Sequence, residues 1–432
     1  PAEVFELSRN YPLYAVLVIA ALLLILVLTW RWSAKEARQW PRRLIALTTA
    51  VMSLNMLFGE LKAAGVTASA PESASLLTLI ATFFQAPPSF ESSLPPQPHE
   101  PGIQCPAHPP NVFLVLEEST FMPSGTASYG VDMQFFDGNV FAGPMRVHVI
   151  GGTTHLSEFA WITGLPHTAL SGENTFPQVP LQGRIHRTLP ELLKACGYTT
   201  SVLYPSGRHF RNSARWYSSV GFDYLLSGDD LHIEDWHTRD EVYFRRALEH
   251  LATLPADKPH FVYVLTINQH GPHAPSDRRK DYMTRLAQSA ADMKTLSDTL
   301  QRAAQAPHAR PWVLSWFGDH RTAIEMDGPE RWMTWAVMSR FPTPSTDAAA
   351  TSKDTAPVDI ANFNRLLQRE IGVAWPTLAK AQDKFLTACR ADFDACSKAN
   401  RDELIREYID TGGFIKAPAS DRSRQTALTQ VK

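Results

Sequence analysis

The sequence lacks an excess of charge of either sign. Its 432 residues carry 41 Lys and Arg against 43 Asp and Glu, which gives a formal net charge of −2 at pH 7. Because so balanced a chain has no strong field to attract a polyanion, the composition does not favour nucleic acid as a partner. We also find no internal repeat at a solenoid-like period, which argues against a repeat architecture.

Cysteine is scarce, with four residues in the whole chain and no C-x2-C spacing. This absence argues against a zinc site built from cysteines. Cys389 and Cys396 are seven residues apart beside a charged helical stretch, a spacing that fits a local disulfide. Cys105 and Cys196 would then form the other pair. Two disulfides would suit an extracytoplasmic compartment.

Long apolar runs are confined to residues 1–86, where we expect membrane helices. Residues 13–30 contain no charge over eighteen positions, about the minimum for a spanning helix. A cleavable signal peptide is the alternative, although basic residues follow this run rather than precede it. Residues 44–59 predict a shorter second span, or else a buried or interfacial helix. Residues 73–84 are too short to span and would lie along the membrane surface.

The loop between the two spans predicts how the chain crosses the membrane. It carries five basic residues, at Arg31, Lys35, Arg38, Arg42 and Arg43. By the positive-inside rule this loop is cytoplasmic, and everything after about residue 60 lies outside the cytoplasm. We therefore expect a multi-pass protein of the inner cell membrane with a periplasmic domain. The same topology predicts a further helix upstream of Pro1.

The remainder predicts a linker, one large domain and a tail. Residues 87–110 are dense in proline and lack periodicity, which is typical of an extended linker. Residues 111–416 are long enough to bury a sizeable core and form the expected catalytic domain. Residues 417–432 are polar and aperiodic, which predicts a disordered tail.

Strand-like and helix-like segments alternate within this domain. Short apolar runs predict buried strands at residues 111–116, 199–204, 260–267 and 312–317. Amphipathic stretches predict helices at residues 188–197, 241–254 and 279–303. The alternation predicts an α/β fold with a mostly parallel sheet sandwiched by helices, whose ligand site lies beyond the carboxyl ends of the strands.

Three of the predicted strands end in residues suited to a polar site. The first is followed by Glu117 and Glu118, which point to opposite sides because they are adjacent. The third leads into His270, and the fourth into Asp319 and His320. Carboxylates with one imidazole suit a divalent cation, and Mn²⁺, Mg²⁺ and Zn²⁺ all remain open.

The stretch IGGTTHLSEF, residues 150–159, supplies the nucleophile that this site would need. Glycines ahead of Thr153 and Thr154 let backbone N–H groups approach an oxyanion. A threonine hydroxyl is inert near neutral pH, but a coordinating dication stabilises its alkoxide.

Four segments in order resemble the sulfatase/alkaline-phosphatase superfamily, namely NVFLVLEEST, GGTTHLSEFAWITGL, LTINQHGPH and FGDH. They are most similar to its branch of lipoteichoic acid synthases and phosphoglycerol transferases, over roughly residues 111–372. The resemblance implies a membrane-anchored, metal-dependent transferase with a phospho-threonine intermediate. Such an enzyme moves a phosphoglycerol or phosphoethanolamine group from a phospholipid donor to a glycan or lipid acceptor.

The resemblance also selects residues. The metal-binding acid of the family precedes a serine, which implies Glu118 rather than Glu117. Its nucleophilic threonine lies four residues before an E-F pair, which implies Thr154 rather than Thr153.

The remaining ligands follow from the same resemblance. The family's Asp-His metal pair falls on Asp319 and His320, so the expected metal ligands are these two with Glu118 and Thr154. The histidine that contacts substrate phosphate falls on His270.

One region departs from the family pattern. Arg211 stands where a Trp is expected, and Ser213 stands where an Arg is expected. We expect Arg211 to bind substrate, with Arg208 and Arg215 as alternatives, because guanidinium pairs bidentately with phosphate. Arg321 follows the Asp-His pair where the family often has Leu.

Other functions use the same residues. With water as the acceptor, the site would act as a metal-dependent phosphodiesterase or phosphatase. A sulfatase is disfavoured because the sequence has no C/S-x-P-x-R element. A non-catalytic, membrane-tethered binding module is disfavoured because all four expected ligands are present. His155 fits loop packing better than acid–base chemistry, and His273 fits either a solvated turn or leaving-group protonation.

Overall fold

The computed structural model describes residues 102–404, apart from 121–129, 168, 170–176, 234, 323, 325–328 and 344–352, together with 406–408 and 413. The expected membrane helices, most of the linker and the polar tail lie outside these residues. Among the described helices, none combines the length and the apolar character needed to cross a membrane.

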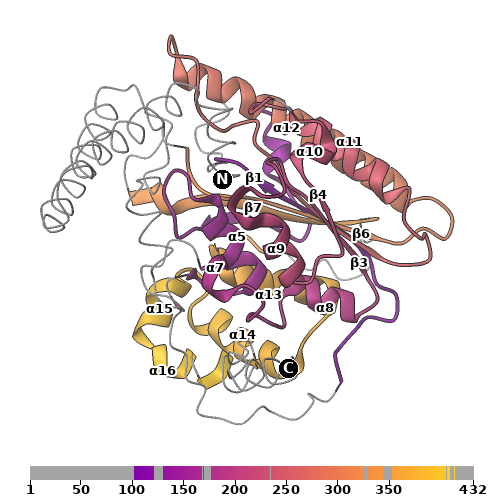
Figure 1. Ribbon diagram of the computed structural model, residues 1–432, viewed down its shortest axis with the longest axis vertical. Helices are drawn as coiled ribbons and strands as arrows, with labels where there is room; N and C mark the ends of the chain where they lie inside the picture. The colour runs from indigo at the N-terminus through magenta and orange to yellow at the C-terminus, as the bar shows by residue number, and fades with distance from the viewer. Residues whose placement is uncertain are drawn as a thin grey trace, which may run out of the picture. The chain divides into compact units, whose positions relative to one another are not determined.

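A sheet with strand order β4-β3-β5-β1-β6-β7-β2-β8 forms the centre of the described part (Figure 1). The strands are β1 (Asn111–Glu117), β2 (Phe141–Arg146), β3 (Thr199–Leu203), β4 (Tyr224–Leu226), β5 (His260–Leu265), β6 (Trp312–Gly318), β7 (Met333–Phe341) and β8 (Val358–Asp359). Among these strands only β7 is antiparallel to its neighbours. The structure therefore confirms the mostly parallel α/β sheet.

Helices cover both faces of this sheet (Figure 1). One face carries α11 (Asp240–Leu251) and α12 (Arg278–Ala304). The other carries α5 (Thr154–Thr163), α8 (Leu189–Ala195) and α13 (Ile360–Ile371), with α14 (Pro376–Ala388) packed on α13. The shorter helices are η3 (Met133–Phe136), α7 (Gln178–Leu181), η4 (Phe210–Asn212), α9 (Ser213–Ser219), α10 (Gly228–Leu231), η6 (Pro329–Trp332), α15 (Phe393–Ala399) and α16 (Arg401–Leu404).

The centre of the sheet is the hydrophobic core. Every residue of β1, β5 and β6 is buried, as expected for parallel strands covered on both faces. Aromatic rings join α5 to the sheet, since Trp161 lies edge-on to Tyr263 at a centroid distance of 4.7 Å. Burying each such side chain stabilises the fold by about 1.5–3 kcal/mol, so the packed core holds the ends of the strands in place.

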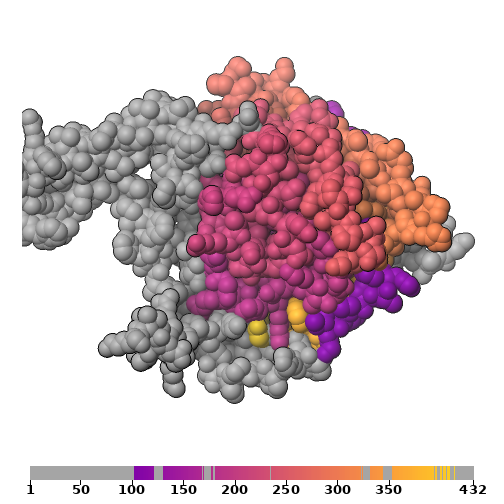
Figure 2. All heavy atoms as spheres, turned by 45° about the vertical axis from the view of Figure 1, so that its right-hand side comes forward, coloured from indigo at the N-terminus to yellow at the C-terminus, as the bar shows by residue number. Residues whose placement is uncertain are grey.

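Both expected disulfides are present. The bond between Cys105 and Cys196 joins the segment ahead of β1 to the end of α8. In the space-filling view this indigo segment lies beside an orange part of the surface (Figure 2). There Arg310 Nη1 donates to the carbonyl of Pro109 at 3.4 Å.

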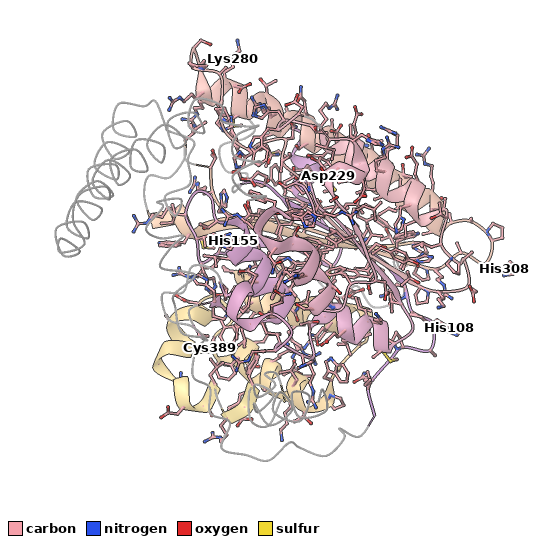
Figure 3. The ribbon with its side chains drawn as sticks, in the orientation of Figure 1. His108, His155, Asp229, Lys280, His308 and Cys389 are labelled. Carbon is pink, nitrogen blue, oxygen red and sulfur yellow. A yellow bond between two sulfur atoms is a disulfide. The ribbon has the colours of Figure 1, made fainter. Side chains whose placement is uncertain are left out.

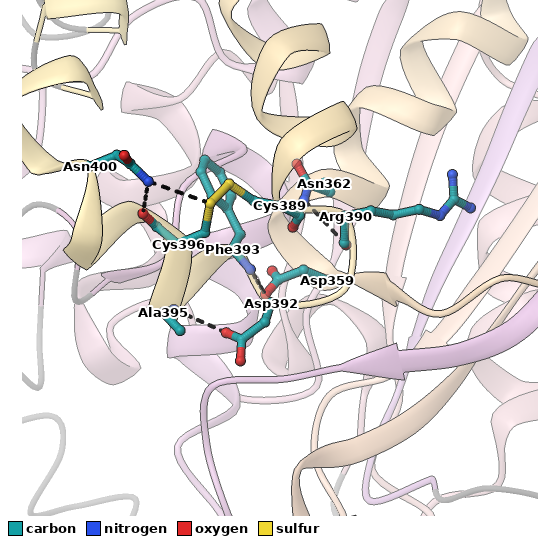
Figure 4. Close-up of a disulfide and its surroundings, with 9 residues drawn as sticks. All are labelled: Asp359, Asn362, Cys389, Arg390, Asp392, Phe393, Ala395, Cys396 and Asn400. Atoms are coloured by element: carbon teal, nitrogen blue, oxygen red, sulfur yellow. Dashed lines mark hydrogen bonds between the residues drawn. A yellow bond between two sulfur atoms is a disulfide. The ribbon is translucent and has the colours of Figure 1, made fainter.

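The second disulfide, between Cys389 and Cys396, links the end of α14 to α15 (Figure 4). Side-chain amides flank it, with Asn362 donating to the carbonyl of Cys389 at 2.8 Å and Asn400 to that of Cys396 at 2.9 Å. The pairing predicted from the sequence is therefore confirmed for all four cysteines.

Candidate active site

The carboxyl ends of β1 and β6 bring together three of the predicted metal ligands. Glu118 follows β1, and Asp319 and His320 follow β6, which pairs in parallel with β1 as far as Glu117 and Gly318. One ligand atom from each of the three residues lies within 4.8 Å of the other two. Their side chains are almost fully buried, and the mixed oxygen and nitrogen donors suit a divalent cation.

Asp319 is held so that one carboxylate oxygen remains available. Its Oδ1 accepts the backbone N–H groups of Ser119 and His320, each at 2.7 Å. Its Oδ2 is buried and receives no hydrogen bond within the described residues. Burial, reinforced by the charge of Glu118, raises the pKa of Asp319 to about 7. A bound cation would stabilise this carboxylate, so the residue fits a metal ligand.

His320 has a defined tautomer. Its Nδ1 lies 3.0 Å from the carbonyl of Arg321, which can only accept, so Nδ1 carries the hydrogen and Nε2 keeps its lone pair. Nε2 accepts the N–H of Gly152 at 2.9 Å, and it lies 3.1 Å from Asp319 Oδ2. Burial disfavours the imidazolium, but the carboxylates of Asp319 and Glu118 raise the pKa of His320 overall. Ligation through Nε2 would replace the contact with Gly152.

Thr154 is the first residue of α5 and faces the same cluster. Its hydroxyl donates to Glu118 Oε2 at 3.3 Å. Hydrogen bonding from the same hydroxyl to the Asp319 carboxylate partly opposes the rise in the pKa of Asp319. The first N–H groups of a helix have no intrahelical acceptor and favour an anion. The structure therefore joins a hydroxyl, an anion-binding helix end and a possible metal cluster.

The backbone ahead of Thr154 is left-handed over three residues. Gly151, Gly152 and Thr153 have φ values of 54°, 84° and 65°. Glycine adopts such angles easily, but a β-branched threonine does so only under strain. Strain of this kind is concentrated at functional sites, where the surrounding fold enforces it. At this turn it brings the start of α5 to the cluster of Glu118, Asp319 and His320.

A further left-handed residue, Ser119 with φ 56°, turns the chain directly after Glu118. Its hydroxyl donates to Glu118 Oε1 at 2.7 Å, which orients the carboxylate. Its carbonyl accepts the hydroxyl of Tyr282 from α12 at 2.6 Å. The serine after Glu118 therefore has a local structural role.

Glu158 fastens α5 to its surroundings. It is buried, and its Oε1 accepts the hydroxyls of Tyr217 at 2.6 Å and Tyr263 at 3.0 Å. Burial raises its pKa to about 7, although both tyrosine hydrogen bonds favour the carboxylate. The glutamate of the E-F pair thus positions the helix that carries Thr154.

His270 follows β5 and therefore lies at the same edge of the sheet as the cluster. The indole N–H of Trp236 contacts its Nδ1, and Arg285 Nη1 donates to its carbonyl at 3.2 Å. Trp236 was not predicted, because only the fold brings its loop to the end of β5. The phosphate-binding role of His270 stays a prediction.

The arginine candidates have different surroundings. Arg211 lies in η4 with a left-handed φ of 48°, and its substrate-binding role stays a prediction. Arg208 forms a bidentate pair with Asp230, with both distances at 2.8 Å, so its guanidinium is already engaged. Arg215 is exposed on α9.

The two other histidines differ in position. His155, the second residue of α5, is half-buried at the start of the helix (Figure 3). His273 is not a solvated turn residue, because its side chain is only 8% exposed and lies 3.7 Å from Asp281. Burial lowers the pKa of His273 to about 4, so it is neutral at pH 7.

Sequence comparisons identify relatives of the chain. A protein of Haemophilus influenzae, described as uncharacterized, is 27% identical over 338 residues, which cover 69% of this chain and 60% of that protein. The capsular polysaccharide biosynthesis protein RkpI of Rhizobium meliloti is 25% identical over 207 residues, which cover 46% of this chain and 36% of RkpI. The chain thus spans less than two thirds of the length of either relative.

The fold is also found in a solved structure. The phosphoglycerol transferase GacH of Streptococcus pyogenes, solved with sn-glycerol-1-phosphate, superposes with a TM-score of 0.52 at 15% identity. The match covers 72% of this chain and 91% of that one. A family model described as Sulfatase matches residues 110–342, more than half of the sequence. The chain therefore belongs to the sulfatase family.

Proposed function

We propose that the protein is a membrane-anchored, metal-dependent transferase. It moves a phosphoglycerol or phosphoethanolamine group from a phospholipid to a glycan or lipid acceptor. The observation that carries the proposal is the Thr154 hydroxyl, 3.3 Å from Glu118 at the start of α5 and beside the cluster of Asp319 and His320. The fold shared with a phosphoglycerol transferase supports the choice of chemistry.

Four residues of the chain fit a single divalent cation. Glu118, Asp319 and His320 would hold it together with the hydroxyl oxygen of Thr154. When bound, such a cation lowers the pKa of a coordinated hydroxyl and neutralises charge on a phosphate. The donor set is compatible with Mn²⁺, Mg²⁺ or Zn²⁺.

The first step transfers the head group to the protein. Thr154 Oγ1 forms a bond to the phosphorus of the donor, and the bond from phosphorus to the diacylglycerol oxygen breaks. The proton lost by Thr154 is balanced by the proton that diacylglycerol gains. The first N–H groups of α5 face the phosphate oxygens and stabilise their charge.

The second step restores the threonine. A hydroxyl of the acceptor attacks the phospho-threonine, its oxygen forms the new bond to phosphorus, and the bond from phosphorus to Thr154 Oγ1 breaks. The proton lost by the acceptor hydroxyl balances the proton that Thr154 gains. We assign phosphate contacts to His270, at the end of β5, and to Arg211. Nucleophilic catalysis thus divides one difficult displacement into two easier ones.

Transfer and hydrolysis differ in their response to an acceptor. The purified full chain is incubated in detergent with phosphatidylglycerol or phosphatidylethanolamine, with and without a glycolipid acceptor. We expect slow release of the water-soluble head group without the acceptor, and uptake of the group when the acceptor is added. Fast release without any acceptor would instead favour the phosphodiesterase alternative.

We also propose that residues 1–86 anchor the chain and that the catalytic domain faces the periplasm. The basic loop and the two disulfides support this topology. A Ser92→Cys variant should react with a membrane-impermeant thiol reagent in intact cells, and Ala37→Cys only after permeabilisation. Because the four native cysteines are paired, they should add little background. The reverse pattern would place the site in the cytoplasm.

A further inference from the structure

A second group of buried acids lies on the other side of β1. Glu117, the last residue of β1, faces α11 and α12 rather than the Thr154 site. Next to it is Asp240, the first residue of α11. Both side chains have an exposed fraction of 0%. Two carboxyl groups thus meet in the interior without access to solvent.

Most of the carboxyl oxygens of this pair lack a donor. Within the described residues, Glu117 Oε2 and both Oδ atoms of Asp240 receive no hydrogen bond. The remaining oxygen, Glu117 Oε1, accepts the side-chain amide of Gln269 at 3.0 Å. An unsatisfied buried carboxylate costs several kcal/mol, and such a group in a native fold needs an explanation, of which a bound ion is one.

Nearby positive charge is insufficient to neutralise the acids. The pair lies close to a third carboxylate, Asp292, which is 4% exposed and is engaged by the Arg239 guanidinium through Nε at 3.3 Å and through Nη2. The Arg239 guanidinium is therefore already engaged by Asp292, and it also acts on Asp240.

Hydroxyl groups complete the surroundings of the pair. The Tyr243 hydroxyl, one turn along α11 and within the influence of Asp240, is buried and has no partner in the described part of the chain. Ser289, on α12, is fully buried and places its hydroxyl beside both carboxyl groups. The atoms that converge here are oxygens from β1, α11 and α12. Hard divalent cations prefer such donors.

We infer that Glu117 and Asp240 bind a second divalent cation of the hard type, such as Ca²⁺ or Mg²⁺, that stabilises the fold. It would neutralise the two unpaired carboxylates and join the start of α11 to the end of β1. Because Glu118 is the next residue along the chain, this cation would also hold the main chain behind the catalytic cluster.

The test separates this cation from the catalytic one. Asp319→Asn with His320→Asn removes two catalytic ligands, so any remaining response to a cation comes from elsewhere. The purified full chain in this background is stripped with EDTA and titrated with Ca²⁺ or Mg²⁺ during thermal unfolding. We expect the unfolding temperature to rise by roughly 5 °C at saturation. Adding Asp240→Asn should abolish the rise.

A matched control and a second readout make the outcome decisive. Glu249→Gln removes an exposed carboxylate from the same helix and should leave the thermal response unchanged. Elemental analysis should find one bound cation per chain in the background variant and none after Asp240→Asn. If Asp240→Asn does not fold, Glu117→Gln replaces it with the same expected loss.

One result would overturn the inference. If the background variant shows neither a thermal shift nor a bound cation, the two carboxyl groups share a proton instead. The outcome does not depend on the proposed transferase activity, because neither readout uses a substrate.

Discussion

The two sides of β1 carry two clusters of acids that differ in what surrounds them. On the side of α5, two backbone N–H groups donate to Asp319 Oδ1. The Thr154 hydroxyl lies 3.3 Å from Glu118 Oε2, and the His320 imidazole lies 3.1 Å from Asp319 Oδ2. On the side of α11 and α12, Glu117 and Asp240 have three oxygens without a donor and no such nucleophile.

This difference distinguishes the site that we propose for catalysis from the site that we infer only binds a cation. The first cluster includes Thr154 at a helix N-terminus, next to left-handed residues that hold it there. The second is enclosed by regular helices and has no exposed path to a substrate-sized group, since both carboxyl side chains are fully buried. Burial of acids therefore does not by itself identify a catalytic centre.

The largest expected effect is on the nucleophile. Thr154→Ala should lower turnover at least about 10³-fold, because the metal and substrate still bind but no oxygen can attack phosphorus. Thr154→Ser, which keeps the hydroxyl, should retain a substantial part of the rate. Head-group release from a defined phospholipid measures both. A rate near wild type in Thr154→Ala would move the role to another residue, with Thr153 as the first candidate.

Removing a ligand should have the next largest effect. Asp319→Asn should weaken binding of the catalytic cation by more than about 100-fold, since outer-shell partners alone contribute 10–100-fold. Calorimetric titration measures the affinity. The matched control is Asp229→Asn, which changes an exposed aspartate on α10 and should bind the cation as wild type does. Equal loss in both variants would show that the cation does not bind at the cluster.

A steric change at the end of β6 tests whether turnover depends on the position of Asp319. A Cβ at Gly318 would lie 2.4 Å from the backbone oxygen of Thr120, so Gly318→Ala should cost about 1–3 kcal/mol and displace Asp319. Gly138→Ala meets the Phe141 backbone oxygen at 2.5 Å, away from the cluster. Denaturant unfolding should show a loss in both variants, whereas turnover should fall only in Gly318→Ala. Equal turnover in the two variants would show that the geometry at the end of β6 does not affect catalysis.

Trp236→Phe should have the smallest effect of the four. It removes the N–H that contacts His270 but keeps an aromatic ring, which in wild type lies edge-on to the imidazole at 4.8 Å. We expect kcat/KM to fall several-fold, which corresponds to the loss of about one hydrogen bond. Steady-state kinetics and a thermal unfolding curve measure the change. A fall in stability with unchanged kinetics would give Trp236 a purely structural role.

Much of the fold could be predicted because it depends on local patterns. The four predicted strands are the apolar runs that become β1, β3, β5 and β6, and the three predicted helices become α8, α11 and α12. Four strands were not predicted. One is β7, a nine-residue run. The others are β2, whose run FAGPMR contains Gly143 and Pro144, and β4 and β8, which have three and two residues. Such short or broken segments become strands only through their neighbours in the sheet.

The candidate site also combines residues that could be predicted from the sequence with residues that could not. Asp319 and His320 could be found from their position after a strand, because parallel strands place their carboxyl ends at one edge. The choice of Glu118 over Glu117 required the family resemblance, and the structure explains it through their opposite directions. The partnership of Glu117 with Asp240 could not be predicted, because it joins residues far apart in the sequence through the packing of α11.

Intact-protein mass spectrometry of the full chain, after incubation with phosphatidylglycerol or phosphatidylethanolamine, can detect the covalent intermediate on Thr154. We expect an added mass equal to one phosphoglycerol or phosphoethanolamine group, mapped by peptide analysis to Thr154 and absent from Thr154→Ala. Turnover of the lipid with no adduct, or an adduct that persists in Thr154→Ala, would contradict this expectation.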